Sequence, residues 1–171
     1  MSNFQYQQWS PGATIDAPLT LYACVVAPEW IDYNGHMTES SYLWAFGEAS
    51  DALFRYIGID ENYRAAGHSF YTVETHINYY KEMKNGELLR FATQLLGLDE
   101  KRLHLFHTMV HGATAELVCT TEQMLVHVAM QAAASAPILP AVYRALNAIM
   151  AVHKTMSIPT QVGRQMAIKK R

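Results

Sequence analysis

The chain has 171 residues, half of them hydrophobic, and its 13 basic and 15 acidic side chains give a formal net charge of −2. This size and composition fit one globular domain with a sizeable core and disfavour intrinsic disorder. No block of like charge precedes the last three residues, Lys169, Lys170 and Arg171, so we expect no nucleic-acid partner.

The only cysteines are Cys24 and Cys119, which lack the Cys-x-x-Cys spacing of a redox or zinc motif and favour neither a disulfide framework nor a metal site. The N-terminus lacks the basic and apolar regions of a signal peptide, and no run approaches the roughly 18 apolar residues of a membrane span. We therefore expect a cytoplasmic protein without membrane association. The sequence has no Gly-x-Ser-x-Gly elbow, phosphate-binding glycine loop or dinucleotide fingerprint, which disfavours serine-hydrolase and nucleotide-driven chemistries, and we expect no cofactor.

Residues 1–18 contain two prolines and a glycine among polar residues, which predicts an extended lead-in. Residues 19–26 are β-rich, with an apolar or small residue at every odd position, and predict a first strand that ends before Pro28. The loop from Trp30 to Thr38 follows. Its Asn34-Gly35 pair is a turn signal, because both residue types tolerate positive φ.

Helical periodicity begins at Glu39 and continues to Ile57, where Gly58 supplies a stop. One side of this helix carries Tyr42, Phe46, Ala49, Leu53 and Ile57. The other side carries Trp44, Ala45 and Ala52 around Glu48. A helix that is apolar nearly all round is predicted to be largely buried, enclosed by a sheet.

Four β-like runs follow a variable link and cover residues 69–80, 87–98, 102–110 and 115–130. Turn-like sequences at 84–86, 98–101 and 111–113 separate them and predict an antiparallel meander. A second helix is predicted over about residues 140–150, before an irregular tail over 154–171. The pattern predicts an α+β fold in which one curved antiparallel sheet wraps one long buried helix, with sheet edges that favour self-association.

The pattern Asp32-x-Asn34-x-His36, ahead of a helix that carries Tyr42 and then Glu48-Ala49, resembles the signature of hotdog-fold acyl thioesterases of the 4-hydroxybenzoyl-CoA thioesterase type. The resemblance extends over most of the chain, through Ile77-x-Tyr79, Gly86-Glu87, Asp99-x-Lys101-Arg102 and the run from Glu122 to His127. One departure is Thr38, where many members have asparagine. The resemblance implies a single hotdog domain, here residues 19–153, an acyl-CoA substrate, and a homodimer or homotetramer.

Thioester hydrolysis needs a group that attacks or activates water, and donors for the oxyanion that develops. We predict Asp32 as the general base or the nucleophile, two roles that the residues alone do not separate. Asn34 and His36 are predicted to orient Asp32 or the water. The alternative for these residues is a plain Asx-turn followed by a helix cap.

The helix start supplies the second requirement. Backbone N–H groups at Gly35, Met37 and Thr38 are predicted to form the oxyanion site, since free N–H groups and the helix dipole favour negative charge there.

Glu48 is a second catalytic candidate, because some hotdog enzymes place a carboxylate on this helix; the alternative is an ion pair with Arg55 or with a neighbouring chain. Tyr42 is either a substrate contact or core packing.

His104, His107 and His111 lie in a predicted strand, which sends His104 to the opposite face and favours surface or half-buried histidines over a metal site. His76 and His127 are interpreted in the same way. Four basic residues at hairpin ends are candidates for the coenzyme A phosphates, with solvated turns as the alternative: Lys81, Lys84, Lys101 and Arg102.

Two other functional classes remain open at this point. A hotdog dehydratase pairs a histidine with a carboxylate across a dimer, for which His36 and Glu48 are a poor match. A non-catalytic acyl-binding module would keep the fold without the chemistry. The intact Asp32, Asn34 and His36 favour hydrolysis.

The segment from Asp32 to Met37 is especially similar to thioesterases of carnitine breakdown, which act on betainyl-CoA, a short acyl thioester with a quaternary ammonium. Such a cation cannot donate an N–H hydrogen bond and is held by aromatic faces, often beside a carboxylate. Glu48 is a candidate carboxylate, and five aromatic residues are candidates for a cage: Trp30, Tyr33, Trp44, Tyr79 and Tyr80. The alternative is that these rings fill the core or shape an ordinary short-acyl pocket.

Overall fold

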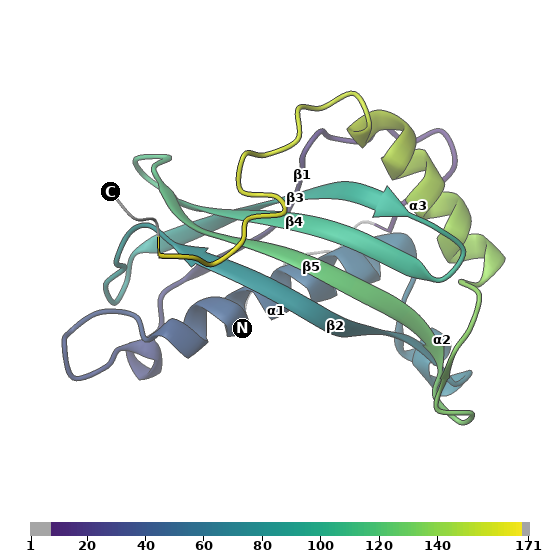
Figure 1. Cartoon of the computed structure of the whole chain (residues 1–171), viewed down its shortest axis with the longest axis horizontal. Helices are drawn as coiled ribbons and strands as arrows, with labels where there is room; N and C mark the ends of the chain where they lie inside the picture. The colour runs from purple at the N-terminus through teal and green to yellow at the C-terminus, as the bar shows by residue number, and fades with distance from the viewer. Residues whose placement is uncertain (1–7, 169–171) are drawn as a thin grey trace.

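The computed structural model describes residues 8–168, in which one antiparallel sheet curls around a long helix (Figure 1). The elements in chain order are β1 (Leu19–Val25), η1 (Pro28–Trp30), α1 (Glu39–Ile57), α2 (Glu61–Ala65), β2 (His68–Tyr79), β3 (Leu88–Leu98), β4 (Arg102–His111), β5 (Leu117–Ala129), β6 (Ala134–Ser135) and α3 (Pro140–His153). Residues 1–7 of the predicted lead-in and the basic run 169–171 lie outside the described residues.

The predicted bounds of α1 are confirmed, and each predicted strand lies within two residues of the observed one. Gly58 ends α1 in the left-handed conformation, with φ at 95°, and its N–H donates to the Arg55 carbonyl. The sequence reasoning missed the short helix α2. Its N-cap is Asp60, whose carboxylate accepts from the Tyr63 N–H at 2.9 Å.

The predicted meander is wrong for one strand. The sheet order is β1-β3-β4-β5-β2, so β3, β4 and β5 pair in sequence, whereas β2 pairs with β5 and β3 pairs with β1. The turn at Lys84 does form, since the Glu87 N–H donates to the Lys84 carbonyl, but it does not join paired strands. Residues 80–87 instead cross from one edge of the sheet to the other, because β1 already occupies the free side of β3. Met83 is buried in this crossing.

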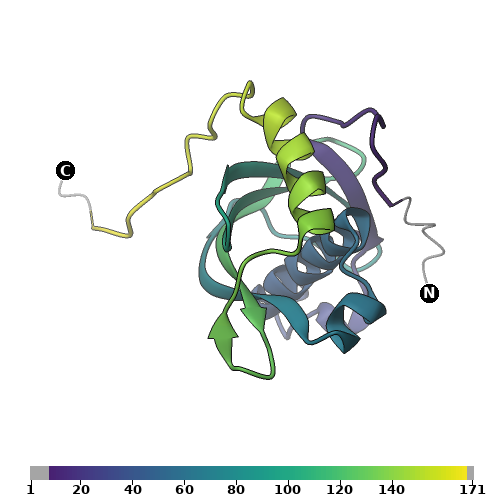
Figure 2. The same ribbon diagram turned by 90° about the vertical axis from the view of Figure 1, so that its right-hand side faces the viewer.

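The concave side of the sheet packs on α1, as the end-on view shows (Figure 2). Two apolar clusters fill this space. The first joins the C-terminal half of α1 to α3 and the far ends of the strands, and the second surrounds Phe46, Met37 and Met83 near the start of α1. The Asp32 loop, residues 30–38, therefore lies at the end of the sheet that α3 does not cover.

The sheet encloses α1 as predicted, but one face of the helix is exposed. Ala45 and Ala52 are buried as expected, but Trp44 is 53% exposed, and Leu43 and Gly47 are also exposed beside it. The sheet of a single chain curls around only part of the helix, so an apolar strip of α1 faces outward.

Two of the predicted surface histidines are fully buried. His107 lies against α1, where its Nε2 is 3.1 Å from the Ser50 hydroxyl and its Nδ1 is 2.9 Å from the Thr93 hydroxyl. His127 is held by the Tyr63 hydroxyl at 2.8 Å. His104 does lie on the opposite face from His107, as predicted, and pairs with Glu122 at 2.8 Å.

The tail after α3 follows the convex face of the sheet (Figure 1). Gln94 donates to the Ser157 carbonyl at 3.3 Å, and Glu122 accepts from the Gly163 N–H at 2.8 Å. Within residues 8–168, no helix combines the length and apolar character that a bilayer crossing requires.

Candidate active site

The Asp32 loop is a short closed hairpin between η1 and α1. Ile31 and Met37 form an antiparallel bridge, and the Asp32 N–H donates to the His36 carbonyl at 2.9 Å. Gly35 adopts φ of +80°, which closes the turn at a position where most side chains would be strained. The Met37 N–H donates to the Met83 carbonyl at 2.7 Å and ties the loop to the 80–87 crossing.

The half-buried Asp32 carboxylate accepts the backbone N–H of Asn34 at 2.8 Å. This is the Asx-turn of the alternative interpretation, made with the Asn34 backbone while the Asn34 side chain is exposed. His36 lies 3.3 Å from a Glu82 oxygen, so its imidazole pairs with the crossing segment, and no bond joins it to Asp32 among the described residues. The second carboxylate oxygen of Asp32 forms no hydrogen bond or ion pair with a described residue.

The N–H groups predicted to form the oxyanion site already have acceptors. Gly35 donates to the Asp32 carbonyl, Met37 to Met83, and Thr38 to the Trp30 carbonyl at 2.8 Å. The Thr38 side chain is at the N-cap position but makes no cap bond. Within the described chain, Glu39 and Ser40 have backbone N–H groups without an acceptor, because they open α1 and precede its first intrahelical bonds.

A pocket of about 310 Å³ lies where the start of α1 meets the end of β2 and the crossing. We call it the tyrosine pocket; its lining residues are Met37, Glu39, Tyr42, Tyr79, Tyr80, Lys81 and Glu82. Tyr42 and Tyr79 meet edge to face at 5.4 Å, and the Tyr79 hydroxyl donates to the Glu39 carbonyl at 3.2 Å. Glu82 joins this pocket to the Asp32 loop through His36.

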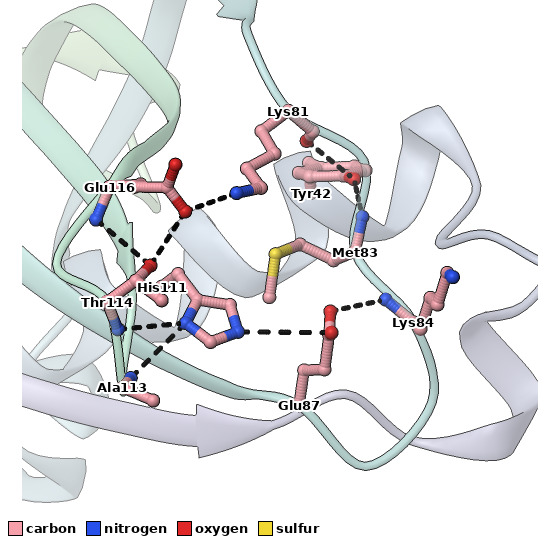
Figure 3. Close-up of polar contacts among 9 residues, drawn as sticks. All are labelled: Tyr42, Lys81, Met83, Lys84, Glu87, His111, Ala113, Thr114 and Glu116. Carbon is pink, nitrogen blue, oxygen red and sulfur yellow. Dashed lines mark hydrogen bonds and ion pairs between the residues drawn. The ribbon is translucent and has the colours of Figure 1, made fainter.

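Tyr42 holds the 80–87 crossing in place through two hydrogen bonds to its backbone. Its hydroxyl donates to the Lys81 carbonyl at 3.3 Å and accepts the Met83 N–H at 3.1 Å (Figure 3). Burial raises the Tyr42 pKa to about 12, so the phenol stays protonated and keeps its donor. Tyr42 therefore packs in the core and also lines the pocket, while its contact with a substrate stays a prediction.

The side chain of Lys81 points toward the β4–β5 turn, where its ammonium pairs with Glu116 (Figure 3). Hydrogen bonds from Lys81 and Thr114 lower the Glu116 pKa, so the carboxylate stays charged. The Lys81 charge is neutralised by Glu116, which lies outside the pocket. Glu39 and Glu82 therefore give the pocket an excess of negative charge.

The five candidate cage aromatics fall into three groups. Trp30 and Trp44 pack edge to face at 5.0 Å, Tyr79 and Tyr80 line the tyrosine pocket, and Tyr33 is 96% exposed at the loop tip. A single chain therefore does not bring all five rings together, and which of them contact the substrate stays a prediction.

Glu48 does not line the tyrosine pocket. It is half-buried on the side of α1 that faces β1, where its charge helps to raise the pKa of the Cys24 thiol after the larger effect of burial. The alternative partner proposed for it, Arg55, pairs with Asp51 at 2.5 Å.

Sequence reasoning missed Glu39 and Glu82 as pocket residues. Glu39 is the first residue of α1, and a carboxylate there has an ordinary reason in the helix dipole, so it gave no separate signal. Glu82 belongs to the crossing, whose path could not be known while β2 and β3 were expected to form a hairpin. No group of three or more His, Cys, Asp or Glu among residues 8–168 is arranged to hold a metal ion.

The sequence model of the thioesterase-like superfamily matches residues 26–146, a span that includes the Asp32 loop, α1 and all the long strands except β1. The chain belongs to this superfamily, in agreement with the resemblance stated from its sequence. A crystal structure of a Pseudomonas putida KT2440 protein, provisionally assigned as a thioesterase, has a TM-score of 0.78 and 35% sequence identity, and covers 90% of this chain and 98% of that one.

Several relatives carry functional names. An L-carnitine dehydrogenase/betainyl-CoA thioesterase of Rhizobium meliloti (strain 1021) is 42% identical over 176 residues, which cover 99% of this chain and 36% of the relative. A betainyl-CoA thioesterase of Pseudomonas aeruginosa is 40% identical over 151 residues, which cover 88% of this chain and 95% of the relative. The chain thus spans about a third of the length of the Rhizobium protein and nearly all of the Pseudomonas one.

Proposed function

We propose that this chain hydrolyses betainyl-CoA, with Asp32 as general base or nucleophile. The observation that carries the proposal is the tyrosine pocket beside the Asp32 loop, where three phenol rings and two carboxylates line an open space of about 310 Å³. A trimethylammonium is recognised by this combination, since each aromatic face contributes roughly 0.5–2 kcal/mol and a nearby negative charge adds to it.

The lengths of the relatives indicate which segment carries the same activity. The name that the Rhizobium and Pseudomonas proteins share is betainyl-CoA thioesterase, and the Pseudomonas relative carries that name alone while this chain spans 95% of it. The shared segment is therefore the one to which we assign thioester hydrolysis.

The proposed chemistry uses groups at the start of α1. The Asp32 oxygen without a described hydrogen-bond partner either takes a proton from the attacking water or itself attacks the thioester carbonyl, and the Glu39 and Ser40 N–H groups receive the oxyanion. The C–S bond then breaks and coenzyme A leaves as the thiol; on the second route, water hydrolyses the anhydride formed with Asp32. These two donors replace the three first predicted, which are bonded to backbone carbonyls. His36 and Glu82 link the loop to the pocket, so that the acyl cation and the reacting carbonyl keep a fixed separation.

We further propose that the active enzyme is a homodimer formed through β2, in the reducing cytoplasm that two free cysteines suit. β2 is a 12-residue edge strand that contains no lysine or proline to block pairing, and Tyr71 and Val73 on it are 53% and 60% exposed. The exposed strip of α1 at Leu43 and Trp44 is a second apolar surface for the same partner.

The deciding experiment compares kcat/KM for betainyl-CoA and for its neutral isostere, 4,4-dimethylvaleryl-CoA. We expect the cation to be favoured by at least about 10-fold, or 1.4 kcal/mol, and Tyr79→Leu and Tyr80→Leu to remove most of that preference. Tyr143→Leu serves as the matched control, because Tyr143 lies on α3, outside both the tyrosine pocket and the proposed dimer surface. Equal turnover of the isostere by the wild type would leave a thioesterase for other short acyl groups.

A further inference from the structure

A second cavity, of about 850 Å³, lies between the N-terminal segment, β1, β3 and the C-terminal half of α1. We call it the Trp9 cavity. It shares no lining residue with the tyrosine pocket, and its helix residues, Ala52 and Tyr56, are at least ten positions along α1 from Tyr42, roughly 15 Å of helix. Its volume falls in the range of ordinary small-molecule sites.

Aromatic rings form much of the cavity wall. They come from four separate elements of the chain: Trp9, Tyr22, Tyr56 and Phe91. The rings of Tyr22 and Phe91 contact each other with centroids 5.0 Å apart. These rings offer π faces to a ligand cation.

Two opposite charges also line the cavity, Asp16 from the N-terminal segment and Arg90 from β3. Both are exposed residues, and neither side chain forms a hydrogen bond or ion pair with any residue in the range 8–168. The Asp16 charge is felt inside the cavity, because it contributes to a raised Tyr56 pKa after the larger effect of burial.

The indole Nε1–H of Trp9 is buried and has no acceptor in the described structure. A buried donor without a partner loses the hydrogen bond that water would have supplied, which costs free energy. A ligand oxygen in the cavity is a natural acceptor for it, since Trp9 lines the cavity.

We propose that the Trp9 cavity binds a small zwitterion that joins a quaternary ammonium to a carboxylate. Its cation packs on the aromatic wall beside Asp16, and its carboxylate accepts from Arg90 and from the Trp9 indole. The ammonium of an ordinary amino acid is more strongly hydrated than a quaternary ammonium and gains less from aromatic faces, so we expect it to bind more weakly. The site needs no thioester, so it does not rest on the proposed catalytic function.

The experiment follows the indole N–H signals of the three tryptophans by NMR during titration with glycine betaine or L-carnitine. Trp9 reports on this cavity, whereas Trp30 and Trp44 lie together at the other end of α1, and a Trp9→Phe variant assigns the Trp9 signal. We expect the Trp9 signal to move in a saturable manner below about 10 mM ligand, in the wild type and equally in Asp32→Asn.

Two variants and a matched control identify the contacts. Arg90→Gln and Asp16→Asn should each weaken binding at least about 10-fold, while Arg144→Gln, an exposed arginine on α3, should leave it unchanged. Glycine and 4-aminobutyrate, which carry N–H ammonium groups, should bind at least about 10-fold more weakly than glycine betaine. A Trp9 signal that stays in place, or that moves as strongly with glycine, would overturn the proposal.

Discussion

At the scale of single residues, Asp32 combines a structural and a proposed chemical role. One carboxylate oxygen closes the Asx-turn with Asn34, and the other is left for substrate or water. A residue that holds its own loop in place presents its reactive atom with little freedom, which favours catalysis. The chemical role can be tested separately from the turn, because an asparagine at position 32 would also accept the Asn34 N–H through its side-chain carbonyl.

We therefore expect Asp32→Asn to lower kcat by about 100-fold or more while the protein stays folded, since a base or nucleophile is removed and the turn is kept. Steady-state hydrolysis and circular dichroism measure the two effects. Asp51→Asn, a carboxylate of α1 paired with Arg55, is the control and should keep wild-type turnover. Turnover near the wild-type value in Asp32→Asn would refute the assignment.

The neighbours of Asp32 should matter less. Asn34→Ala and His36→Ala are expected to give smaller but clear losses of kcat/KM, because they change the loop and its link to Glu82 rather than the reacting group. Wild-type kcat/KM in both variants would show that these two side chains have no catalytic role and that the loop is only a connection.

His107 gives the protein an acid-sensitive core. Burial lowers its pKa from 6.5 to about 4, so the folded state binds no proton there over an interval in which the unfolded state does. Its contribution to stability is complete above pH 6.5 and falls by up to roughly 3 kcal/mol as the pH drops toward 4. Burial lowers the pKa values of His127 and His153 as well, which steepens the same loss.

Urea unfolding at about pH 7 and pH 4.5 measures this loss in the wild type and in His107→Gln. The variant should be less stable at neutral pH, since bonds to Ser50 and Thr93 are weakened, but it should lose less on acidification. An equal acid loss in both proteins would show that His107 is not the responsible group.

At the scale of elements, periodic patterns in the sequence predicted the long helix and the long strands. The period of α1 and its Gly58 stop gave both ends of the helix, and alternation gave the long strands. Strand partners were not predictable in the same way, because pairing of β2 with β5 depends on which edge stays free after β1 joins β3. The same limit hid Glu82, which reaches His36 only through the 80–87 crossing. The Asp32 loop was found because its polar residues are consecutive.

The limits of the hotdog domain, proposed as residues 19–153, are testable through α3. This helix buries Val142, Leu146 and Ile149 in the core, and His153 at its end accepts the Leu95 N–H at 2.9 Å. A chain that ends after Lys154 should fold, whereas one that ends after Leu139 should not, because it exposes the apolar surface that α3 covers. Circular dichroism and thermal unfolding measure both. Unfolding of the longer chain would place the boundary later.

At the scale of the whole molecule, the sheet is open at β2 and α1 is uncovered along one strip, and we assign both surfaces to one partner copy. Tyr71→Lys combined with Val73→Lys should convert a dimer to a monomer and reduce activity, since charges on an edge strand oppose pairing. Light scattering after size-exclusion chromatography measures the mass. Ile158→Lys, on the exposed tail, is the control. A wild-type monomer with full activity would contradict this assignment.

The sheet order also constrains when the protein can form during synthesis. β1 must wait for β3, and β2 must wait for β5, whose register with it runs from His68 opposite Ala129 to Tyr79 opposite Cys119. Only β3, β4 and β5 find a partner in the next strand along the chain. Pairings of such long sequence separation pay the entropy of loop closure first and slow folding, typically to milliseconds or seconds. A ribosome that pauses before residue 129 therefore holds a chain whose β2, with Tyr71 and Val73, has both edges free to pair with another nascent chain.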